Sequence, residues 1–112
     1  MANSIEYSPM FIKRAKNLKK RHPSLTSDLE KLEESLINAP RQGVDFGSGL
    51  YKLRLAVKSK GKGKSGGYRV ITYLVNRSDT DDVIITMLTL FDKSEESSID
   101  KEYLQKAINS LK

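Results

Sequence analysis

Two alternating segments and the loop between them constrain the fold of this chain most strongly. In Leu50–Val57 apolar residues alternate with lysine, arginine or alanine, and a second apolar segment follows at Tyr68–Val75. Strict alternation is typical of a β-strand with one buried and one exposed face. The ten residues between the segments, 58–67, are only lysine, glycine and serine, a composition typical of a turn. The pattern predicts two strands of a sheet joined by a cationic loop.

The same part of the chain carries a concentrated positive charge. No Asp or Glu occurs between Phe46 and Ser78, whereas eight cations do: Lys52, Arg54, Lys58, Lys60, Lys62, Lys64, Arg69 and Arg77. The whole chain has a formal net charge of +6. Because phosphate binding depends on where cations lie, this clustering predicts a nucleic acid or a ribosome as partner.

The segments before these strands predict a short strand and two helices. Ile5–Tyr7 is the strand, and Ser8 followed by Pro9 marks a helix start, because serine caps a helix and proline fits its first turn. The helix continues with apolar residues at helical spacing and with cations such as Arg14 on its opposite face. A second helix, Leu25–Asn38, carries four leucines on one face. Together they predict a helical hairpin that covers a sheet.

The remaining segments complete an α+β fold. We expect Gln42–Gly49 to be a glycine-containing loop. Val83–Phe91 is apolar on both faces, which predicts a central strand. The last segment predicts an amphipathic helix capped by Ser97 or Ser98. The predicted order is β-α-α-β-β-β-α, with an antiparallel sheet packed against the N-terminal helical hairpin, in one domain over residues 1–112.

Composition excludes several classes of protein. The chain contains no cysteine, which excludes a disulfide framework and a thiolate metal site. No apolar run reaches the roughly 18 residues that span a bilayer. The first residues, Met1–Phe11, lack the charged and apolar regions of a signal peptide. We therefore expect a protein of the reducing cytoplasm.

Three common kinds of site fit the chain poorly. The Gly-Lys-Ser run at 63–65 is not a phosphate-binding P-loop, because Lys58 stands where its first glycine belongs and a strand follows it. We expect no metal site, because His22 is the only histidine and the aspartates within 79–82 lack carboxylates on rigid elements around them. Without cysteine, and with one histidine, no nucleophilic triad is expected.

Cations remain as the candidate chemical groups. Lys52 and Arg54 lie on alternating positions of one strand and therefore share a face. If Arg69 on the partner strand joins them, three cations could orient a phosphodiester and stabilise its pentacoordinate oxyanion. A lysine of such a set could also accept a proton from a ribose 2′-hydroxyl. The alternative is that these are exposed strand residues that only bind, and that the loop lysines only keep a hairpin solvated.

Three segments resemble the RelE/HigB toxins of type II toxin–antitoxin systems, within the RelE/ParE superfamily. They are Gly49–Arg54, Lys60–Ile71 with its glycine/lysine hairpin before an aromatic-arginine strand, and Phe91–Glu95. The resemblance implies a compact α+β fold, a cognate antitoxin, and no cofactor. It also implies a metal-independent endoribonuclease that cleaves mRNA, often on the ribosome, leaving a 2′,3′-cyclic phosphate and a 5′-hydroxyl.

The resemblance also implies roles for individual residues. Lys52 and Arg54 match paired strand cations, one as candidate base and the other as phosphate clamp. Arg69 would stabilise the transition state, and Lys93 would contact the leaving group or the phosphate. RNA or ribosome contacts are expected from the hairpin, at Lys58, Lys60, Lys62, Lys64 and Tyr68.

The chain departs from the family pattern at two places. Ser94 stands where some relatives carry a catalytic arginine, so the general acid is not identified. The C-terminal tyrosine with which some relatives stack on a base has no clear match, and Tyr103 lies in the helical stripe expected to be core. Two other functions stay open: a ParE-like toxin that binds a protein such as gyrase, whose relatives lack the cation set, and a plain RNA- or ribosome-binding module.

Overall fold

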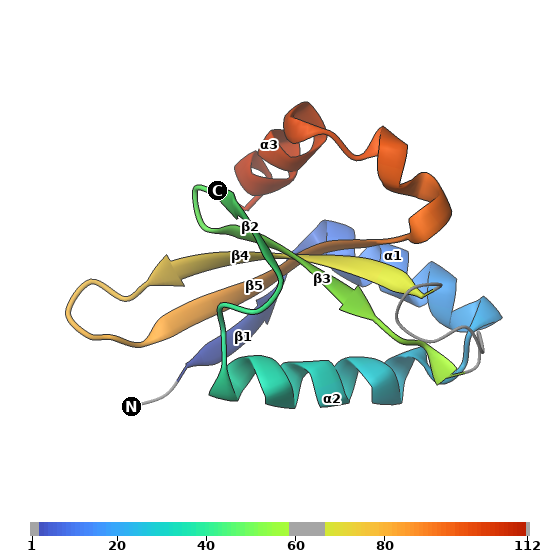
Figure 1. The fold of residues 1–112 in the computed structure, drawn as a ribbon, viewed down its shortest axis with the longest axis horizontal. Helices are drawn as coiled ribbons and strands as arrows, with labels where there is room; N and C mark the ends of the chain where they lie inside the picture. The colour runs from blue at the N-terminus through green and yellow to red at the C-terminus, as the bar shows by residue number, and fades with distance from the viewer. Residues whose placement is uncertain (1–2, 59–66, 112) are drawn as a thin grey trace.

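The computed structural model describes residues 3–58 and 67–111. Figure 1 shows a central sheet with helices on both of its faces. The elements in chain order are β1 (Ser4–Tyr7), α1 (Pro9–Arg21), α2 (Leu25–Asn38), β2 (Val44–Gly47), β3 (Leu50–Leu55), β4 (Tyr68–Asn76), β5 (Val83–Asp92), the 3-10 helix η2 (Lys93–Ser98) and α3 (Lys101–Asn109). The structure confirms the predicted α+β class and both helices of the N-terminal hairpin.

The sheet contains five strands in the order β1-β5-β4-β3-β2. The pairs β2–β3, β3–β4 and β4–β5 are antiparallel, whereas β1 pairs with β5 in parallel. Two details of the prediction were therefore wrong: the sheet is mixed, and the expected loop Gln42–Gly49 contains the edge strand β2. Strand β5 lies between β1 and β4, as its apolar faces predicted.

The start of α1 shows how local sequence fixes an element. The Ser8 hydroxyl oxygen accepts a hydrogen bond from the Phe11 backbone N–H at 3.0 Å, and Pro9 occupies the first turn. The same hydroxyl donates to the Leu88 carbonyl of β5 at 2.6 Å. Ser8 therefore caps the helix and also ties its N-terminus to the sheet.

Each face of the sheet has its own apolar core. The larger core joins the helical hairpin to inward residues of β3, β4 and β5, with Phe11, Leu36 and Leu53 among its buried members. The smaller one joins α3 to the opposite face, around Ile71 and Phe91. Alternation along β3 therefore sends Leu53 and Leu55 toward the hairpin and Lys52 and Arg54 to the α3 side.

The β2–β3 hairpin depends on a tight turn. Ser48 and Gly49 join the strands, and both have positive φ angles, 56° and 84°. Positive φ at both central residues defines a type I′ turn, whose twist matches that of the strands. The Gly49 carbonyl then accepts a bond from the Leu74 N–H at 2.8 Å. This turn fixes β2 against the first half of β3.

Within residues 3–58 and 67–111, no helix combines the length and the apolar character that crossing a bilayer requires.

Candidate active site

The strand register brings the predicted cations together. Arg54 of β3 lies directly opposite Arg69 of β4, and Arg69 in turn lies opposite Phe91 of β5. Lys52 lies two residues before Arg54, opposite Ile71. Side chains at directly paired positions have Cβ atoms about 5 Å apart on one face of the sheet. The two arginine side chains are therefore close enough for one phosphate group to contact both.

These side chains line a cleft of about 1050 Å³. Among the described residues, one carboxylate, Asp28, lines it together with six cations, which are Lys31, Lys52, Arg54, Lys58, Arg69 and Lys93. All four residues predicted to be catalytic therefore line one cleft. A cleft lined by charges of one sign concentrates its field and attracts polyanions.

The cations differ in their exposure to solvent. Arg69 is 4% exposed, Lys52 is half-buried and Arg54 is exposed. Arg69 lines the cleft with only a small part of its side chain, and its charge is poorly hydrated. A charge in that position acts more strongly on a phosphate than a surface charge does. Arg54 is free to approach the same phosphate from the solvent side.

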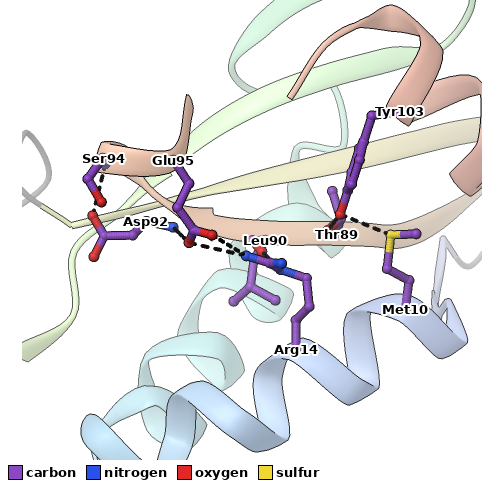
Figure 2. A network of polar contacts seen from close by, with 8 residues as sticks. All are labelled: Met10, Arg14, Thr89, Leu90, Asp92, Ser94, Glu95 and Tyr103. Atoms are coloured by element: carbon purple, nitrogen blue, oxygen red, sulfur yellow. Dashed lines mark hydrogen bonds and ion pairs between the residues drawn. The ribbon is translucent and has the colours of Figure 1, made fainter. Parts of the chain in front are cut away.

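Lys93 reaches the cleft because the turn after β5 is held in place. Figure 2 shows the polar network of this turn. The Asp92 carboxylate accepts a bond from the Ser94 N–H at 3.0 Å, and the Glu95 carboxylate accepts one from the Asp92 N–H at 3.2 Å. Lys93, between these residues, is the first residue of η2 and is exposed.

Arg14 of α1 connects this turn to the body of the molecule. Its Nε donates to the Leu90 carbonyl at 2.6 Å, and its Nη2 lies 3.2 and 3.3 Å from the two carboxylate oxygens of Glu95 (Figure 2). The sequence placed Arg14 on the helix face opposite the apolar stripe and gave no sign of this contact with the sheet. No local pattern could indicate the contact, because its partner lies 81 positions away.

Tyr68 does not lie in the cleft. Its side chain is 1% exposed, belongs to the core beneath the helical hairpin, and meets the His22 ring edge-on at 5.5 Å. Burial, with a smaller contribution from Asp92, raises the pKa of its hydroxyl. The prediction that Tyr68 contacts RNA is therefore corrected: its ring packs in the core, away from the face that carries Arg69.

The other predicted contacts separate into two groups. Lys58 is exposed and lines the cleft. Lys60, Lys62 and Lys64 lie outside the described residues.

Tyr103 packs as expected, since its hydroxyl donates to the Met10 Sδ at 3.3 Å and lies 3.4 Å from the Thr89 hydroxyl (Figure 2).

Across 3–58 and 67–111, no three carboxylate or imidazole side chains converge in an arrangement that could hold a metal ion.

Comparison with known proteins identifies the family. The family model described as "RelE toxin of RelE / RelB toxin-antitoxin system" matches residues 7–111. The chain belongs to the RelE toxin family. A search of curated protein sequences found no match. Membership in the RelE family gives the chain the role of toxin in a toxin–antitoxin system and a RelB-type antitoxin as its partner.

A solved RelE structure shares the fold of this chain. It is the E. coli toxin RelE in the free state, as a mutant in which two arginines are replaced by alanine. The two structures align with a TM-score of 0.61 over 100% of both chains, at 16% sequence identity. At that identity the likeness shows the fold.

Strand β2 places an aromatic ring beside Lys52, and the sequence analysis did not predict this contact. Phe46 is 44% exposed, and the Lys52 Nζ lies 5.3 Å from the centre of its ring. The alternation of Val44, Asp45 and Phe46 before a Gly-Ser-Gly turn was a usable strand signal. The glycines on both sides led to its interpretation as a loop.

Proposed function

We propose that this RelE-family toxin is a metal-independent endoribonuclease that cleaves mRNA on the ribosome and thereby inhibits translation. The observation that carries the proposal is the direct pairing of Arg54 with Arg69 in a cleft that Lys52 and Lys93 also line. Two guanidinium groups at paired positions can bind a phosphodiester from two sides. Such preorganised donors are the usual means of stabilising negative charge that develops in a transition state.

The reaction is a transesterification within the RNA. The ribose 2′-oxygen attacks the adjacent phosphorus, the bond from phosphorus to the 5′-oxygen breaks, and the products carry a 2′,3′-cyclic phosphate and a 5′-hydroxyl. Lys52 would act as the general base that accepts the proton of the 2′-hydroxyl, and Lys93 as the general acid that gives a proton to the departing 5′-oxygen. Arg54 and Arg69 stabilise the pentacoordinate phosphorane between them.

The remaining cations support binding rather than chemistry. Lys58, which lines the cleft, and the lysines at 60, 62 and 64 would attract the RNA backbone or ribosomal RNA. An acidic or amphipathic segment of the antitoxin would compete for the same cations, and would neutralise the toxin by charge and by shape.

Induced expression in a bacterium tests the proposal. We expect the wild-type chain to arrest growth and to create new mRNA 5′ ends, and we expect Arg69→Ala and Arg54→Gln to lose both effects. Arg77→Gln is the matched control, because Arg77 lies in the same acid-free segment but outside the cleft. Unchanged growth and intact transcripts with folded wild-type protein would contradict an endonuclease.

The same experiment separates the other two functions. Growth arrest that persists in the arginine variants without RNA cleavage would indicate a toxin that binds a protein target. Tight, salt-sensitive RNA binding without strand scission would indicate a plain binding module.

A further inference from the structure

Within the part of the chain that the structure describes, one aromatic ring beside the cationic cleft lies outside both apolar cores. Phe46 belongs to neither apolar core, and its side chain stays 44% exposed on the edge strand β2. We propose that Phe46 is a platform on which one nucleobase of the bound RNA stacks, so that the neighbouring phosphate is placed between Arg54 and Arg69. This inference rests on the proposed function and assigns a base-binding subsite to it.

The backbone holds Phe46 in a defined position. The register between β2 and β3 shifts between Asp45 and Gly47, so Phe46 is the extra residue of a β-bulge. The Asp45 carboxylate accepts a bond from the Gly47 N–H at 2.7 Å, and the type I′ turn follows at once. Bulges of this kind redirect a side chain away from the regular alternation of a strand.

The ring lies next to the residues that bind phosphate. Val44 pairs with Lys52, and the Lys52 ammonium lies over the Phe46 ring at 5.3 Å. Arg54 is two residues further along β3, a distance of about 7 Å. A base stacked on Phe46 and a phosphate held by Arg54 therefore belong to the same or to adjacent nucleotides.

The chemistry of the site fits single-stranded RNA. Proteins that bind single strands combine cationic grooves that follow the backbone with exposed aromatic rings on which bases stack. Because every base has a π face, stacking on Phe46 would place a nucleotide without selecting its identity. An apolar segment of the antitoxin is another possible occupant, but the lysine over the ring favours a partner that brings negative charge.

A binding assay with an uncleavable probe tests the platform. The probe is a short single-stranded RNA with 2′-O-methyl groups throughout, which lacks the attacking hydroxyl, and with one 2-aminopurine that moves through the sequence. We expect wild-type protein to quench the fluorophore at one position, Phe46→Leu to abolish the quenching and weaken binding about 10-fold, and Phe46→Trp to restore both. Val75→Leu, at an exposed position of β4 that does not line the cleft, is the control and should change neither.

Several results would overturn the inference. They are the absence of quenching by wild-type protein, equal binding of the probe by wild-type protein and Phe46→Leu, or a Phe46→Leu variant that loses only its neutralisation by the antitoxin. The probe cannot be cleaved, so its binding is measured independently of catalysis. Failure of the proposed nuclease would appear instead as intact transcripts with the wild-type protein.

Discussion

At the scale of single residues, position in the strand register decides what each side chain can do. Arg69 and Tyr68 are neighbours in the chain, but successive strand residues point to opposite faces, so one lines the cleft and the other lies in the core. Tyr7, at the end of β1, donates a hydrogen bond to the Glu33 carboxylate of α2 and packs its ring against Phe11. Its environment can be tested by titration.

We predict that Tyr7 makes stability fall at alkaline pH. Burial, followed by the hydrogen bond and charge of Glu33, raises the pKa of Tyr7 above its ordinary value of 10.0. Above pH 10 the unfolded chain therefore loses this proton while the folded chain keeps it, and stability decreases as pH rises. Tyr7→Phe should lower stability by about 1 kcal/mol at pH 7 and flatten this decrease.

Urea denaturation between pH 7 and 11, for wild type and Tyr7→Phe, measures the effect. The comparison of the two proteins removes the contribution of the lysines, which titrate in the same range. If the free energy of unfolding fell with the same slope above pH 10 in both proteins, the assigned environment of Tyr7 would be contradicted.

At the scale of elements, two connections position the site. The turn from β5 into η2 carries Lys93 and is held by Arg14 from α1. The turn from β2 into β3 carries Phe46 and Lys52 on its two strands and is held by positive φ angles at its centre. In both cases a connection between elements, and not the centre of a strand, determines where a side chain of the candidate site lies.

We predict that Arg14 is a positioning residue for Lys93. Arg14→Ala removes the bonds to Leu90 and Glu95, and should cost about 1–2 kcal/mol of stability. It should also lower the cleavage rate at saturating RNA while RNA affinity stays nearly constant, because the proton donor is misplaced and the phosphate clamp is intact. Lys13→Ala, exposed on the same helix, is the control. A rise in KM alone would contradict this role.

We predict that Gly49 is required for the β2–β3 turn. A Cβ at Gly49 would lie 2.7 Å from the Leu74 carbonyl oxygen, in addition to the strain of a φ of 84°. Gly47 has the same φ but open space around its Cβ position. Gly47→Ala should therefore lower the free energy of unfolding by about 1 kcal/mol, and Gly49→Ala should lower it clearly more. Equal losses in chemical denaturation would show that the contact with Leu74 has no effect.

At the scale of the whole molecule, much of the fold could be predicted from local sequence patterns, such as strand alternation and helix capping. Alternation in β3 and β4 predicted both the sheet and the common face of Lys52 and Arg54, and the Ser-Pro pair predicted the start of α1. The same alternation could have shown that Tyr68 and Arg69 point to opposite faces.

What the sequence could not predict depended on contacts between distant segments. The parallel pairing of β1 with β5 joins residues about 80 positions apart, as does the bond from Arg14 to Glu95. Strand β2 was missed because glycine lowers strand propensity, and pairing with β3 outweighs that preference.

The chemical ends of the cleaved RNA show whether a ribose hydroxyl or a water molecule attacks the phosphate. Transcripts from translating cells that express the chain would be recovered and their new ends analysed. Attack by a 2′-hydroxyl, assisted only by the cations of the cleft, predicts a 2′,3′-cyclic phosphate on the upstream fragment and a 5′-hydroxyl on the downstream one. It also predicts that Arg54→Gln reduces cleavage about 100-fold or more in the folded protein. Ends with a 5′-phosphate and a 3′-hydroxyl would require an attacking water and would contradict the account.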